Sequence, residues 1–110
     1  MAKKRAIPFK IELKGQKRFL RLLGSPGKGV NLRAGLVNLT PKEAVGEHIT
    51  DQKEEAIFII RGTAKVYYGR KVSFIARAKS FIYIPPDTRH DIENIGKSRL
   101  EYIYITSPIE

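Results

Sequence analysis

The sequence contains no cysteine and no tryptophan, and it has only one methionine and two histidines. Without cysteine there can be no disulfide, no thiolate chemistry and no cysteine-ligated zinc or iron–sulfur cluster. A metal ion would have to bind imidazole nitrogens and carboxylate oxygens. Any such site is therefore confined to the two histidines and the acidic residues that approach them in space.

Long hydrophobic runs are also missing. No stretch approaches the roughly 18 apolar residues of a membrane-spanning helix, and the N-terminus lacks the apolar core of a signal peptide. We therefore expect a soluble, cytoplasmic protein that does not interact with membranes. The length of 110 residues predicts a single domain.

Acidic residues are scarce in the first third of the chain. Residues 1–33 contain ten Lys and Arg but one acid, a net charge of +9, whereas residues 34–110 carry +1. We interpret residues 1–6 as a basic N-terminal arm and residues 7–110 as one barrel domain. The basic residues from Lys3 to Arg33 form either a solvated face or a surface that attracts nucleic acid or another anionic partner. No nucleic-acid-binding motif accompanies them.

Short β-prone segments separated by turn signals make up the rest of the chain. From Ile7 to Leu13, apolar residues alternate strictly with other residues, and no segment has the pattern of an amphipathic helix. The pattern predicts an all-β sandwich or barrel. The expected strands span residues 7–13, 18–23, 30–39, 47–50, 54–61, 63–68, 71–75, 81–84, 90–95 and 100–106.

Polar residues interrupt this pattern in residues 46–55. Side chains alternate between the two faces of a strand, so His48 and Thr50 share one face, and Glu55 lies on one face of the following strand. In the second polar segment, an apolar run ends at two prolines and an extended segment restarts at His90. The prolines stiffen the corner that orients this histidine.

If these strands face into one barrel, His48, Glu55 and His90 can converge. Two imidazoles and one carboxylate match a ligand set that leaves open positions on a divalent metal. Two other roles are equally open to them: the histidines can hydrogen-bond across the barrel, and Glu55 can pair with a nearby base. Gln52 is a reserve ligand if its turn folds inward.

The two polar segments resemble the two motifs of the cupin superfamily, over about residues 35–106. The first motif has two histidines, then a glutamate and a glycine, and here it reads His48, Thr50, Glu55 and Gly62. The second motif keeps the spacing of its proline, histidine and asparagine, which are Pro85, His90 and Asn94 here. Thr50 stands at the position of the second histidine, and Lys79 and Asp87 replace turn glycines. Asp87 can adopt the left-handed conformation of a glycine.

The resemblance implies an all-β fold, the double-stranded β-helix or jelly-roll barrel of two antiparallel sheets. It also implies a divalent metal ion such as Mn, Fe, Zn or Ni, held here by His48, Glu55 and His90. The family uses three histidines and the glutamate, so Thr50 leaves three protein ligands. Asn94 is expected to fix the turn at its strand end.

Three functions remain open from the sequence. The first is a metal-dependent enzyme of the isomerase or dioxygenase type, acting on a small oxygen-rich molecule. The second is a metal-free barrel that binds or senses a small sugar or carboxylate. The third is an adaptor that binds nucleic acid or an anionic surface through its basic segment.

Two tyrosines are candidate catalytic residues, since Tyr102 and Tyr104 share one face of the last strand and can donate hydrogen bonds or carry protons. The alternative is a role in the core or at an interface. Arg61 and Arg77 could hold an anionic substrate or lie on the surface. We also expect a homodimer, in which the segment from Ile7 to Leu13 crosses to the partner and outward apolar residues such as Phe58 and Ile60 are covered.

Overall fold

The part of the chain that the structure describes is built from nine β-strands, with no helix. The structure is a computed structural model that describes residues 7–24 and 31–109; the basic arm expected over residues 1–6 lies outside it. No helix in the described ranges is long and apolar enough to cross a membrane. The strands are β1 (Phe19–Leu23), β2 (Arg33–Leu39), β3 (His48–Ile49), β4 (Lys53–Arg61), β5 (Thr63–Tyr68), β6 (Val72–Arg77), β7 (Phe81–Ile84), β8 (Arg89–Asn94) and β9 (Leu100–Pro108).

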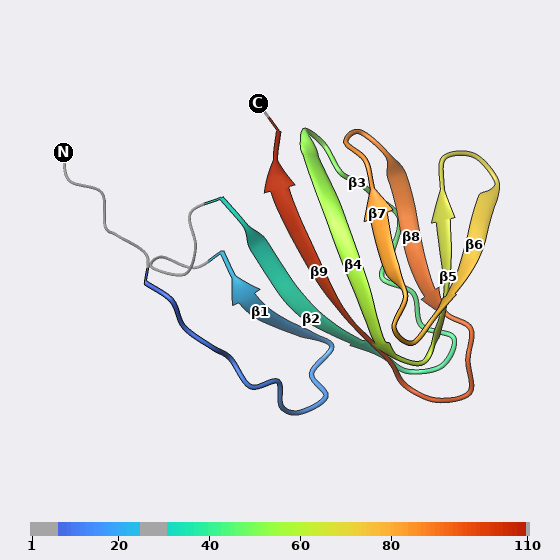
Figure 1. The fold of residues 1–110 in the computed structure, drawn as a ribbon. Coiled ribbons are helices and arrows are strands. Elements are labelled where there is room, and N and C mark those ends of the chain that lie inside the picture. Colours follow the sequence, from blue (N-terminus) through green and yellow to red (C-terminus); the bar gives the residue numbers. More distant parts are fainter. Residues whose placement is uncertain (1–6, 25–30, 110) are drawn as a thin grey trace.

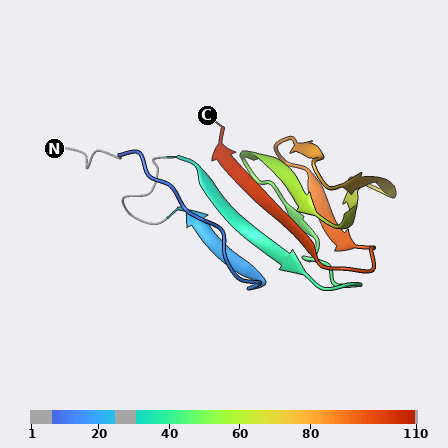
Figure 2. The ribbon, with the colours of Figure 1, turned by 60° about the horizontal axis from the view of Figure 1, so that its bottom comes forward.

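These strands form two antiparallel sheets (Figure 1). One sheet has five strands in the order β1-β2-β9-β4-β7, and the other has four in the order β3-β8-β5-β6. The prediction of an all-β fold with two antiparallel sheets is confirmed. Figure 2 shows β1 and β2 on the side of the five-stranded sheet that is farthest from β5 and β6.

The hydrophobic core lies between the two sheets and follows the alternation of side chains along each strand. On β4, Glu55, Ile57 and Ile59 are buried on the inner face. On β8, the buried positions are His90, Ile92 and Asn94. Full burial of one aliphatic side chain stabilises the fold by about 1.5–3 kcal/mol. Glu55 and His90 are two of the few polar residues buried among these apolar side chains.

Three corners need residues with positive φ. Gly62 joins β4 to β5 with φ of 91°, and a Cβ there would lie 2.7 Å from the carbonyl oxygen of Arg99. Lys79 and Asp87, which replace turn glycines in the cupin pattern, have φ of 71° and 52°. The expectation that Asp87 adopts the left-handed conformation is therefore confirmed.

The strand predicted from Ile7 to Leu13 is wrong. Residues 7–14 are not part of any strand, and Figure 1 shows them as an extended trace beyond β1. The alternating apolar side chains of this segment are exposed, with 70% exposure for Ile7. A strand requires a hydrogen-bonded neighbouring strand as well as a pattern of side chains, and no strand within residues 7–24 and 31–109 forms a β-ladder with this segment.

Candidate metal centre and pocket

Three strands bring the two histidines and Glu55 together. β3 pairs with β8 so that His48 lies directly opposite His90, and the two rings are 4.1 Å apart between centroids. β4 supplies Glu55, whose Oε1 atom lies 3.0 Å from His90 Nε2. One ligand atom from each of the three residues lies within 4.8 Å of the others. The structure therefore assembles the expected cluster from segments that are up to 42 residues apart in sequence.

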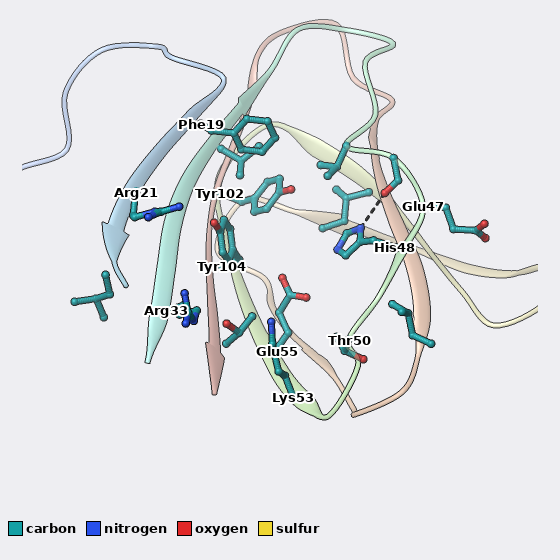
Figure 3. Close-up of a pocket in the computed structure, with 17 residues that line it drawn as sticks. Phe19, Arg21, Arg33, Glu47, His48, Thr50, Lys53, Glu55, Tyr102 and Tyr104 are labelled. Atoms are coloured by element: carbon teal, nitrogen blue, oxygen red, sulfur yellow. Dashed lines mark hydrogen bonds between the residues drawn. The ribbon is translucent and has the colours of Figure 1, made fainter. Parts of the chain in front are cut away.

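Backbone carbonyls fix the orientation of both imidazole rings. His48 Nδ1 lies 2.9 Å from the carbonyl oxygen of Gly46, the contact marked by the dashed line in Figure 3. His90 Nδ1 lies 3.0 Å from the carbonyl oxygen of Thr88. A carbonyl oxygen only accepts hydrogen bonds, so both Nδ1 atoms carry the proton and donate it. Both Nε2 atoms are then the ones available to a ligand, and this backbone-anchored arrangement is typical of histidines that bind metals.

His90 and Glu55 form a buried pair. Burial by itself lowers the pKa of His90, but the hydrogen bonds to Glu55 and Thr88 and the negative charge of Glu55 together raise it above its ordinary value. Without an ion, the protonated imidazole donates its Nε2 proton to the Glu55 carboxylate. A metal ion bound at this point must displace that proton.

The donor set and its spacing fit a divalent ion. Two ligands about 2.1 Å from an ion and at right angles to each other are about 3.0 Å apart. His90 Nε2 and Glu55 Oε1 have the same separation, 3.0 Å. His48 is exposed, on a strand of only two residues, and its ring lies 4.1 Å from that of His90 between centroids. Three protein ligands would leave further positions on the ion open.

Thr50, at the position of the second histidine of the cupin motif, has a structural role. Its side chain is buried, and its hydroxyl donates to the carbonyl oxygen of Pro85 at 2.7 Å. The same hydroxyl accepts a hydrogen bond from the backbone N–H of Thr88 at 3.0 Å. Since the Thr88 carbonyl in turn holds His90, Thr50 positions the corner that carries this histidine.

A pocket of about 510 Å³ opens beside the cluster, between the two sheets (Figure 3). Tyr102 is buried and Tyr104 is half-buried. Both line the pocket from β9, consistent with their lying on one face of that strand. Burial and the negative charge of Glu55 raise the pKa of Tyr102 above its usual range. Tyr102 therefore stays a neutral phenol and can donate a hydrogen bond into the pocket. The lining residues are Phe19, Arg21, Leu23, Arg33, Val37, Val45, Gly46, Glu47, His48, Ile49, Thr50, Lys53, Glu55, Ile92, Tyr102, Tyr104 and Thr106.

Sequence reasoning missed the cations of this pocket. Arg21, Arg33 and Lys53 line it, whereas Arg61 and Arg77, the arginines considered for an anionic substrate, do not. Arg61 lies 3.8 Å from Glu101 instead. The sequence shows which residues share a face with Arg21 or with Arg33. Which face points inward is set by the pairing of β1 with β2 and of β2 with β9, which the sequence does not reveal.

The remaining polar candidates have structural roles or lie outside the pocket. The Asn94 side-chain amide donates to the carbonyl oxygens of Leu39 and Ser98, both at 2.9 Å, and its oxygen accepts from Gly96. It fixes the turn after β8, as expected. Gln52 is exposed and does not line the pocket.

A family model described as a cupin domain matches residues 35–106, more than half of the chain. The chain belongs to the cupin family. Over 71 residues, 64% of its length, this cupin is 32% identical to a mannose-1-phosphate guanylyltransferase from Salmonella montevideo. The match spans only 15% of the length of that relative.

Solved structures share the fold of this cupin at low sequence identity. An RmlC-like cupin family protein with a double-stranded β-helix fold, from Methanocaldococcus jannaschii, superposes with a TM-score of 0.73 at 17% identity, covering 96% of this chain and 91% of that one. A predicted oxalate decarboxylase from Thermotoga maritima superposes with a TM-score of 0.66 at 21% identity, covering 70% of this chain and 66% of that one. The double-stranded β-helix implied by the sequence motifs is confirmed.

Proposed function

We propose that this cupin is a divalent-metal-dependent enzyme that acts on a small oxygen-rich molecule, as an isomerase or a dioxygenase. One observation carries the proposal: His48 and His90 donate their Nδ1 protons to backbone carbonyls and present both Nε2 atoms beside Glu55. His48 and Glu55 of this cluster form part of the wall of a pocket large enough for a small molecule, and His90 lies buried behind them against Glu55.

The bound ion would act as a Lewis acid on substrate oxygens. The protein groups have separate tasks around it. His48, Glu55 and His90 hold the ion, and Thr50 keeps the corner of His90 in place. Tyr102 offers a neutral hydroxyl that can donate a hydrogen bond to the substrate.

The relatives support a small oxygen-rich substrate. One is named for mannose 1-phosphate and another for oxalate, so one name points to a sugar phosphate and the other to a dicarboxylate. Both molecules present several oxygens to a binding site. The pocket of this cupin has hydrogen-bonding and charged groups on its wall that suit such a molecule.

Metal binding tests the proposal directly. Protein purified without a histidine tag is stripped with EDTA, incubated with Mn²⁺, Fe²⁺, Zn²⁺ or Ni²⁺ and analysed for bound metal. We expect one ion per chain for at least one metal, and a loss of binding in Glu55→Gln. Glu54→Gln is the matched control, because the neighbouring Glu54 carboxylate accepts the Tyr83 hydroxyl at 2.7 Å and is outside the cluster. No stoichiometric metal, or equal binding by both variants, would contradict the proposal.

A metal-free binding barrel is the second candidate, because His90 and Glu55 satisfy each other without an ion. A ligand that raises the melting temperature equally in EDTA and in added metal favours this candidate. A melting shift that requires the metal favours the enzyme.

A further inference from the structure

Strand pairing places Arg21 beside the pocket, next to a glycine. Arg21 lies opposite Gly35, and Gly35 lies opposite Tyr104 in the next strand. Cross-strand partners project from the same face of a sheet. Tyr104 lines the pocket, so Arg21 is on the inner face as well.

Gly35 makes room between these two side chains. A Cβ at Gly35 would lie 2.6 Å from the ring of Tyr104, which shows that the ring lies directly over the glycine. Any larger residue would displace the Tyr104 ring and occupy the space beside Arg21. Gly35 therefore lets the Tyr104 ring lie close against β2, and Arg21 and Tyr104 both line the pocket (Figure 3).

A second row of side chains connects another arginine to the metal cluster. Arg33 lies opposite Thr106, and Thr106 lies opposite Glu55. Neighbouring strands are about 4.8 Å apart, so this row separates the backbones of Arg33 and Glu55 by about 10 Å. A small molecule with two polar ends can bridge such a distance.

The cations of the pocket are Arg21, Arg33 and Lys53. Among residues 7–24 and 31–109, no carboxylate lies within ion-pair distance of Arg21, Arg33 or Lys53. Other arginines of the chain are paired, as Arg18 is with Glu43 at 2.8 Å. The pocket cations thus have donors to spare for a ligand.

The two carboxylates of the pocket are already engaged. Glu55 is bound by His90, and Glu47 lies 3.3 Å from Arg89. Neither neutralises the pocket cations. The free charge presented to a ligand by this pocket is therefore positive.

We propose that the ligand of this pocket is an anion whose carboxylate or phosphate group is bound by Arg21 and Arg33, with its other oxygens directed toward the cluster of His48, Glu55 and His90. Guanidinium groups bind carboxylate and phosphate oxygens through paired hydrogen bonds. The cluster end of this inference rests on the proposed function, whereas the anion end requires no metal. An anion site of this kind restricts the expected substrate from oxygen-rich molecules in general to acidic ones.

The test uses metal-free protein in EDTA and three probes: succinate, its neutral analogue succinamide, and inorganic phosphate. Binding is followed by NMR through the backbone amides of Gly35 and Thr106. We expect saturable shifts with succinate or phosphate and none of comparable affinity with succinamide. Arg21→Gln and Arg33→Gln should each lower the affinity for the anion by about tenfold, which corresponds to the loss of one charge-assisted hydrogen bond.

Arg70→Gln is the matched control, because Arg70 is exposed in the turn between β5 and β6, away from the pocket. Its anion affinity should equal that of the unchanged protein. Tighter binding of succinate identifies a carboxylate ligand, and tighter binding of phosphate identifies a phosphate ligand. Equal affinity for succinate and succinamide, no saturable shift with either anion, or unchanged affinity in Arg33→Gln would overturn the inference.

Glu55→Gln separates this inference from the proposed function. If this variant loses metal and keeps arginine-dependent anion binding, both ideas stand. If the protein binds anions but no metal, the proposed function fails and the anion site stands. If the protein binds metal but no anion, the anion site fails and the proposed function stands.

Discussion

At the scale of single residues, the histidines illustrate how the backbone prepares a side chain for binding. Each Nδ1 proton is donated to a carbonyl two residues earlier in the chain, from Gly46 for His48 and from Thr88 for His90. An imidazole held in this way cannot rotate its Nε2 atom away without breaking a hydrogen bond. Folding therefore orients both imidazole rings before any ligand binds.

Thr50 gives a stability prediction at the same scale. Thr50→Val should lower the free energy of unfolding by about 2 kcal/mol, because Pro85 O and Thr88 N would lose their buried hydrogen-bond partner. Urea denaturation measures the effect. Thr50→Ser keeps the hydroxyl and should cost much less; equal stability of the valine and serine variants would show that the hydroxyl is not needed.

At the scale of elements, the corner between β4 and β5 shows two separate reasons why a turn can require glycine. Gly62 has a positive φ, and it also lies against the backbone of Arg99 and Leu100. Gly69, in the turn between β5 and β6, has a positive φ of 59° but open space around it. Substitution of these two glycines can therefore distinguish the cost of backbone strain from the cost of steric contact.

Alanine substitution at these corners should have unequal effects. Gly69→Ala should lower the free energy of unfolding by about 1 kcal/mol, the cost of the left-handed conformation. Gly62→Ala should cost clearly more, about 3 kcal/mol, because its Cβ also meets backbone atoms that cannot move easily. Urea denaturation of both variants measures the difference, and equal losses would contradict the account.

The elements also show which features a sequence can predict. β4 through β9 follow from period-two patterns and glycine or proline breaks, and the convergence of His48, Glu55 and His90 follows from placing both motifs in one barrel. The segment from Ile7 to Leu13 has the same pattern but is in neither sheet of the described part of the chain. The position of Arg21 depends on the register of β1 against β2, and that of Arg33 on the register of β2 against β9. Both registers arise from long-range pairing and leave no local signal.

At the scale of the whole molecule, the outer face of the five-stranded sheet is notably apolar. Phe58 lies opposite Phe81 on one side and Ile103 on the other, and Phe81 is 70% exposed. Soluble monomers rarely leave large contiguous apolar patches in water. We infer that a second copy of the chain covers this face.

Light scattering coupled to size exclusion checks this inference. We expect the unchanged protein to elute at twice the mass of one chain, and Phe81→Glu to shift it toward the monomer. Ile75→Glu is the control, since Ile75 is a half-exposed aliphatic residue on β6 in the other sheet. A monomeric unchanged protein, or dissociation by Ile75→Glu alone, would contradict pairing through this face.

The central claim is that His48, Glu55 and His90 together hold one divalent ion. The most direct measurement is an anomalous difference map from crystals grown with Mn²⁺. We expect one strong peak within bonding distance of Nε2 of both histidines and of the Glu55 carboxylate, and no such peak in Glu55→Gln crystals. A map without a peak at this point, in crystals that hold Mn²⁺ elsewhere, would contradict the claim.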